Sequence, residues 1–170
     1  MAKVDLYTFT DLYRRVLDSL SHLLGKGAEF AKANGISEAE MLQWRLIDDM
    51  SPLAFQVRIV VNFTRAWPAR VLGAPLPEDI AQDLSVAQLQ HEIAASKAYL
   101  ADLTAGQFED RDDVPLQVTL GTGMAPTLPA GQWLSVFATT NIYFHLSIAY
   151  AILRSRGVQI GKSDLFAGQL

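Results

Sequence analysis

Hydrophobic residues recur every three or four positions in four long stretches of this chain, which is the spacing of one face of an α-helix. The first stretch carries Leu6, Phe9, Tyr13, Val16, Leu17, Leu20 and Leu24. The sequence "ANG" at residues 33–35 is typical of a helix end, because glycine adopts the left-handed backbone conformation without strain. We therefore expect the first long helix to end near Gly35.

Polar residues with capping properties mark where the next helices begin. Ser37 and Glu40 have the spacing of a capping box, which predicts a short helix. Ser51 is placed to cap the second long helix, with Pro52 at its first position. One face of that helix carries Leu53, Val60, Phe63 and Trp67. Pro68 is expected to kink or weaken it, because proline lacks the backbone N–H.

The third long helix begins at Ser85, where Gln88 completes another capping box. Its inner face carries Val86, Leu89, Ile93, Leu100 and Leu103. The helical period then disappears over residues 107–131. Alternation from Val114 to Leu120, followed by Gly-Thr-Gly, predicts a small hairpin or an ordered loop.

The fourth long helix is expected over residues 132–156, with Gly157 placed to end it. Four amphipathic helices without a central sheet predict an all-α four-helix bundle. A short extra helix and a long loop or small hairpin before the last helix complete this fold. The length of 170 residues suits one domain, which we expect to span residues 1–170.

Composition and charge narrow the classes of function. A net charge of −4 and the absence of a basic stripe predict no nucleic-acid partner. Without cysteine, the chain has no disulfide, thiolate metal ligand or cysteine nucleophile, which fits the cytoplasm, where we expect the protein. No apolar run approaches the roughly 18 residues of a membrane-spanning helix, and the start lacks the apolar core of a signal peptide. We therefore expect no membrane partner.

Three polar side chains interrupt the apolar faces of two helices. Asn141 and His145 are one turn apart on the face of the fourth long helix that carries Phe137. Gln56 lies on the face of the second long helix that carries Trp67. A buried polar group without a partner costs about 1–3 kcal/mol, so these groups should bond to each other, to water or to a ligand. We expect either a satisfied core network or a ligand pocket formed by all five residues.

Metal binding requires more donors than this cluster offers. One imidazole and two carboxamides make a poor ligand set for zinc or nickel, so we predict no cofactor. Any divalent metal, with zinc or nickel as the candidates, would use His145, Asn141 and Gln56. His22 and His91 fall opposite the apolar faces of their helices and are expected in solvent. Phosphate-binding, dinucleotide-binding, nucleophile-elbow and metalloprotease motifs are absent, so the catalytic residues are unknown and enzyme activity stays an open question.

Two segments resemble a known family. "NIYFHLSIAYAILRSRGVQIGKSDLFAG" at residues 141–168 and "LIDDMSPLAFQVRIV" at residues 46–60 resemble the signatures of the domain of unknown function 1993 family. The intervals agree over essentially the full chain. That family belongs with the DinB/YfiT-like four-helix bundles, so the resemblance implies a DinB-like bundle. Many of those relatives form dimers, which implies a homodimer here.

The resemblance also implies a position for a site. Many DinB/YfiT-like relatives hold a divalent metal with three histidines, and some use it in thiol-dependent transferase chemistry. Asn141 and His145 match the histidine pair of the last helix, and Gln56 lies near the expected position of the third. Since one histidine of three is kept, metal-dependent activity is poorly supported.

Three hypotheses follow from the residues and the resemblance. The favoured one is a small-molecule-binding or structural protein with a degenerate metal site. The alternative is a metal- or thiol-dependent transferase of the DinB/YfiT type with its site around His145. A third is an interaction module that uses an exposed helix face and the loop over residues 107–131.

Overall fold

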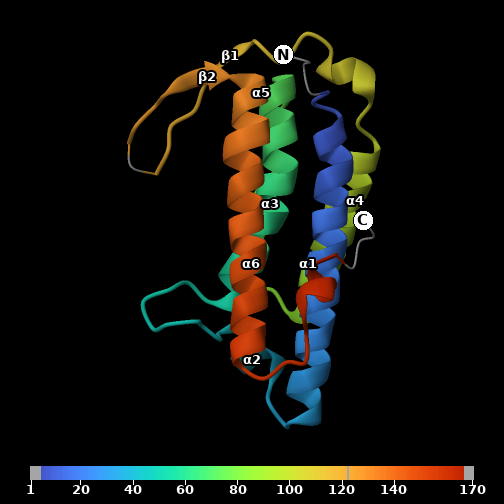
Figure 1. Cartoon of the computed structure of the whole chain (residues 1–170), viewed down its shortest axis with the longest axis vertical. Helices are drawn as coiled ribbons and strands as arrows, with labels where there is room; N and C mark the ends of the chain where they lie inside the picture. The colour runs from blue at the N-terminus through green and yellow to red at the C-terminus, as the bar shows by residue number, and fades with distance from the viewer. Residues whose placement is uncertain (1–4, 122, 167–170) are drawn as a thin grey trace.

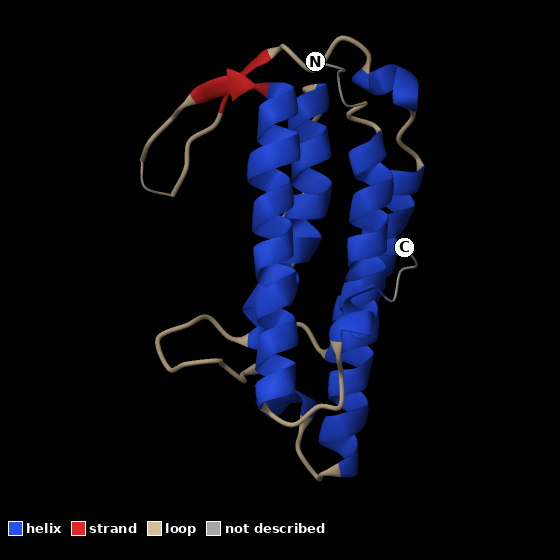
Figure 2. Cartoon of the chain, in the orientation of Figure 1, coloured by secondary structure: helices blue, strands red, loops and turns tan. Residues whose placement is uncertain are grey.

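The computed structural model describes residues 5–121 and 123–166, which form a bundle around four long helices (Figure 1). The long helices are α1 (Thr8–Ala33), α3 (Leu53–Leu72), α4 (Val86–Ala101) and α6 (Thr139–Ser155). The shorter helices are α2 (Glu38–Leu42), η1 (Ala105–Phe108) and η3 (Lys162–Phe166). Strands β1 (Pro115–Gln117) and β2 (Thr127–Pro129) form an antiparallel hairpin before the last helix (Figure 2). The predicted all-α bundle with a short extra helix and a small hairpin is confirmed.

The bundle core forms where the apolar helix faces meet. Helices α3 and α6 pack along each other, and α1 packs along α4 (Figure 1). The core includes Leu17, Leu20, Val60, Ile93, Ile142 and Leu146, each exposing 3% or less of its surface. Burying one such side chain contributes about 1.5–3 kcal/mol, so the shared core is the main source of stability.

Capping explains where α4 and α2 begin. Ser85 Oγ accepts from the Gln88 backbone N–H at 3.3 Å, and Gln88 Oε1 accepts from the Ser85 backbone N–H at 2.9 Å. The predicted capping box of α4 is therefore confirmed. In α2, Ser37 Oγ accepts from the Glu40 backbone N–H at 3.1 Å, which is one half of the predicted box.

Helix α3 differs from its prediction at its start. Pro52 occupies the capping position and Leu53 is the first helical residue, so Ser51 is not the cap. The Ser51 carbonyl instead accepts a bond from inside the helix, described below. Pro68 lies within the helix, which continues to Leu72 before Gly73 ends it in the left-handed conformation.

The last helix starts two residues earlier than predicted and contains a wider turn. Helix α5 (Ala130–Gln132) continues through the π-helical segment η2 (Trp133–Ala138) into α6. The Leu134 carbonyl in η2 accepts from the hydroxyl of Tyr13 at 3.2 Å and from that of Thr139 at 2.9 Å. These two bonds satisfy the carbonyl in the wider turn, and they join α1 to the last helix. Burial raises the pKa of the Tyr13 phenol.

By length and composition alone, the helix over Ala130–Ser155 is long and apolar enough to cross a membrane. In its most apolar 18-residue stretch, 33% is buried. This length is not evident as an uninterrupted apolar run, because Asn141 and His145 break it. Core helices of bundles share this composition, and α6 forms one wall of the core (Figure 1).

The C-terminal segment changes the surroundings of His22. Helix η3 packs on α1, and the His22 Nε2 lies 2.7 Å from Asp164 Oδ1. Two hydrogen bonds lower the pKa of the Asp164 carboxyl: the larger effect comes from the Gly161 backbone N–H and the smaller from His22. His22 is therefore paired rather than free in solvent, because a segment distant in sequence folds back over α1. His91 is exposed, as predicted.

Candidate functional site

His145 and Gln56 meet between α6 and α3. The buried Gln56 donates from Nε2 to the Ser51 carbonyl at 2.9 Å, which turns its Oε1 toward His145. His145 Nδ1 lies 2.7 Å from that oxygen. Because a carboxamide oxygen only accepts, Nδ1 carries the proton in this pair. Burial lowers the pKa of His145, so the imidazole is neutral at pH 7.

Two phenylalanine rings flank this imidazole. Phe55 lies 6.0 Å and Phe144 lies 5.2 Å from it between ring centroids, and both meet it edge-on. The hydrogen bond and the rings together fix the orientation of the imidazole. Nε2 of His145 has no hydrogen-bond partner within the described parts of the chain, so it remains available as an acceptor.

Asn141 does not join the His145–Gln56 pair. Its Nδ2 donates to the Phe137 carbonyl one turn earlier on the same helix, at 3.2 Å. A nearby backbone carbonyl competes well for a short carboxamide side chain. The structure thus brings Gln56 and His145 together, whereas Asn141 bonds within its own helix.

The donors around His145 do not fit a transition-metal site. Gln56 Oε1 is already bonded to Nδ1, on the opposite side of the ring from Nε2. Within residues 5–121 and 123–166, no group of three His, Cys, Asp or Glu side chains is placed to hold a metal ion. A single imidazole nitrogen does not provide the three protein ligands that catalytic zinc sites use.

Trp67 and Phe137 belong to a separate aromatic cluster nearer the hairpin. Trp67 stacks on Trp133 with ring centroids 5.5 Å apart, and Phe137 lies 5.2 Å from each indole. Trp133 donates from Nε1 to the Leu116 carbonyl at 2.7 Å, which ties strand β1 to the last helix. The π-helical segment η2 presents both Trp133 and Phe137 to this cluster.

A pocket of about 300 Å³ adjoins the aromatic cluster. Its walls come from one face of α3, the connection before α4, the hairpin residues 118–121 and Phe137. Trp67 and Phe137 line this pocket, whereas Gln56, Asn141 and His145 are not among its lining residues.

Two polar residues of α3 that line this pocket, Asn62 and Arg70, were not among the site residues predicted from the sequence. They share one face of α3 with Ala66, at spacings of four residues. The available signal was a carboxamide inside the apolar run "VVNF". Phe63 and Trp67 mark the apolar face of this helix, and the row of Asn62, Ala66 and Arg70 lies beside that face.

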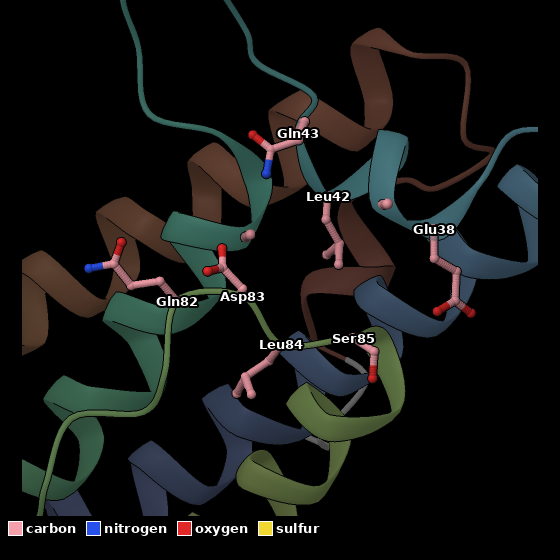
Figure 3. A pocket seen from close by; sticks show the side chains of 9 residues that line it. Glu38, Leu42, Gln43, Gln82, Asp83, Leu84 and Ser85 are labelled. Carbon is pink, nitrogen blue, oxygen red and sulfur yellow. The ribbon is translucent and has the colours of Figure 1, made fainter.

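A larger pocket of about 490 Å³ lies at the other end of α3 (Figure 3). It is bounded by α2, the start of α3 and residues 82–85, and its lining includes Leu42, Leu84, Glu38 and Asp83 (Figure 3). It contains none of the five predicted site residues. Both carboxylates are exposed, and Ser85 is already engaged as a helix cap, so the pocket offers volume without a polar group that needs a ligand.

Comparisons with known proteins match most of the chain. A family described as "Domain of unknown function (DUF1993)" matches residues 6–166. No curated protein matches the chain. Among solved structures, the chain is similar to the crystal structure of a DinB family member protein from Shewanella denitrificans, with a TM-score of 0.82 and 28% identity. That similarity covers 95% of this chain and 91% of the other.

Proposed function

Because this chain belongs to the DUF1993 family, as its signatures predicted, and has a DinB-like bundle, we propose that it is a small-molecule-binding protein with a degenerate metal site. The observation that supports this most is the 300 Å³ pocket beside Trp67 and Phe137. Ligand pockets typically enclose about 300–1,000 Å³ and are lined mainly by apolar and aromatic side chains. The π-helical turn that presents Phe137 adds support, since such turns are frequent at functional sites.

The hairpin supplies the outer wall of this pocket. Val118 is buried, and Leu120 packs against the core beside it. The bond from Trp133 Nε1 to the Leu116 carbonyl holds the base of the hairpin against η2. A flat ligand between α3 and residues 118–121 would gain stacking and exclusion from water without a change in the bundle.

The alternative is a metal- or thiol-dependent transferase with its site around His145. One observation favours it: His145 is neutral, its Nδ1–H is held by Gln56, and its Nε2 is open. Histidines that bind metals commonly donate their second N–H to a carbonyl in this way. A metal-dependent transferase also needs further ligands, and no group of three His, Cys, Asp or Glu side chains among the described residues is placed to supply them.

A thermal-shift screen of flat small molecules and divalent metals tests the proposal. A ligand present at about 100 times its Kd stabilises the folded state by about 2.7 kcal/mol. We expect Phe137→Ala to reduce the shift produced by any hit by more than half, because it removes one pocket wall. His145→Ala is expected to leave that shift unchanged. Phe30→Ala is the matched control, since Phe30 also packs on a tryptophan, Trp44, but far from the pocket.

Elemental analysis of the purified, untagged protein decides between the two functions. We expect zinc and nickel well below one equivalent in both wild type and His145→Ala. Stoichiometric metal that is lost in His145→Ala would favour the transferase instead. A screen in which no compound shifts the melting temperature would contradict the binding function.

The exposed face of α6 supports a further proposal, that the protein forms a homodimer. Between Ala130 and Leu153 the sequence contains no Asp, Glu, Lys or Arg. The exposed side chains between Val136 and Ser147 form a neutral stripe, which we call the α6 stripe: Val136, Thr140, Tyr143, Phe144 and Ser147. An uncharged, largely apolar stripe is self-complementary across a two-fold axis, as a symmetric dimer requires.

Phe144→Glu is expected to convert the dimer to a monomer, because it places two like charges in the α6 stripe at the interface. The Kd of the dimer should rise at least tenfold, measured by light scattering over a concentration series. Leu76→Glu is the control, since Leu76 is also an exposed apolar side chain (46%, against 55% for Phe144) and lies in the loop before α4. Wild-type protein that is monomeric at high micromolar concentration would refute the dimer.

A further inference from the structure

Asn62 lines the pocket beside Trp67 and Phe137 and has an unused hydrogen-bond donor. Its side chain is only 5% exposed, and its Oδ1 accepts from the Ile80 backbone N–H at 3.0 Å. That bond fixes the orientation of the carboxamide, so Nδ2 is the polar atom left over. Nδ2 is buried and has no acceptor within the described residues. Buried amide donors are nearly always paired, so this one calls for an acceptor that the chain does not supply.

Arg70 brings a second unused donor to the same pocket. Its guanidinium lies over the Trp67 ring, 5.6 Å from the centroid. Within the described chain it forms no ion pair with a carboxylate. A guanidinium over an indole keeps its N–H groups free to donate to an acceptor beside the ring. The pocket thus contains a positioned cation that lacks an anion.

The spacing of these donors on α3 suits one small acceptor group. Asn62, Ala66 and Arg70 follow each other at four-residue intervals on one face. A helical arginine side chain leans toward the preceding turn, which narrows the gap between its guanidinium and the level of Asn62. A carboxylate that accepts bonds of about 2.9 Å on both sides can bridge that gap. The small Ala66 side chain leaves the space between them open.

We propose that this pocket binds a small monocarboxylate with a flat apolar body, its carboxylate between Asn62 and Arg70 and its body against Trp67 and Phe137. This inference rests on the proposed binding function and adds the chemical class of the ligand. The two unused polar groups, Asn62 Nδ2 and the Arg70 guanidinium, are donors, which disfavours a cationic ligand.

A monocarboxylate fits better than a phosphate. A single guanidinium balances one negative charge, and the exposed Asp79 on the pocket rim opposes a second. The net charge of −4 also disfavours a dianion. Phe63 and Ile59 extend the apolar wall, which an inorganic ion would leave uncovered.

Benzoate and its neutral analogue benzamide are the probes, because they share shape and differ in charge. Binding to the full chain is measured by tryptophan fluorescence and by calorimetry. We expect benzoate to bind at least tenfold more tightly than benzamide. Equal affinity for the two would overturn the carboxylate assignment while leaving a binding pocket in place.

Two substitutions test the donors. Arg70→Gln and Asn62→Asp should each weaken benzoate binding at least tenfold and change benzamide binding less than threefold. Asn62→Asp keeps the oxygen that accepts from Ile80 and replaces only the unpaired donor. Arg156→Gln is the matched control, since Arg156 also lies over an indole, that of Trp44, at the opposite end of α6. Unchanged benzoate affinity in Arg70→Gln would overturn the proposal.

A third substitution separates failure of the ligand class from failure of the pocket. Ala66→Leu fills the space between Asn62 and Arg70 and should abolish binding of both probes, with the fold checked by circular dichroism. If both probes bind equally well to Ala66→Leu and to wild type, they bind elsewhere, and the pocket itself is wrong. If neither probe binds wild type although other neutral compounds stabilise it, the carboxylate class alone is wrong.

Discussion

Replacing Trp133 by alanine is expected to lower the free energy of unfolding by about 3–5 kcal/mol, the usual range for removal of a large buried aromatic side chain. Trp133 exposes 1% of its surface and contacts both other members of the aromatic cluster, Trp67 and Phe137. Its indole N–H also donates to the Leu116 carbonyl at the base of the hairpin. The substitution therefore removes core volume and a tether at the same time.

Trp133→Phe separates these two effects. Phenylalanine keeps most of the ring packing but cannot donate, so we expect a smaller loss of about 1–2 kcal/mol, most of it from the unpaired Leu116 carbonyl. Urea unfolding followed by circular dichroism measures both variants. A Trp133→Ala loss below about 1 kcal/mol would show that the cluster is not part of the cooperative core.

The helices of this fold were predictable because each carries its own local signal. The stripe from Leu6 to Leu24 and the Ser85–Gln88 capping box depend on residues a few positions apart, so they act within one element. The start of α3 was harder, since Ser51 and Pro52 offer two neighbouring solutions. The structure uses Pro52, and the Ser51 carbonyl accepts from Gln56 instead.

The candidate site was less predictable because it depends on contacts between distant segments. The pairing of Gln56 with His145 was foreseeable, since both lie on apolar faces of helices expected to pack. Asn141 shares its face with His145 but bonds locally, and helical spacing does not distinguish those outcomes. The unpaired donor of Asn62 becomes evident only when Ile80, 18 residues later, is seen to occupy its oxygen.

Gly131→Ala is expected to destabilise the protein by about 1–3 kcal/mol, the usual cost of overpacking. Gly131 is the second residue of the last helix, and its backbone N–H donates to the Asp112 carbonyl at 3.0 Å. A Cβ there would overlap the Asp112 carboxylate and lie 3.2 Å from its carbonyl oxygen. This hydrogen bond joins the backbone at Asp112 to the backbone of the last helix. The added methyl group would therefore push the segment before the hairpin away from that helix.

Gly25→Ala is the matched control, because a Cβ at Gly25 in α1 meets no atom within 4 Å. Alanine is favoured over glycine inside a helix by about 0.5–1 kcal/mol, so this variant should be more stable than wild type. If urea unfolding shows changes of opposite sign in the free energy of unfolding of the two variants, the effect comes from the Asp112 contact and not from helix propensity. A stabilising Gly131→Ala would show that the hairpin segment shifts freely, and the outer pocket wall would then not be held in place by this contact.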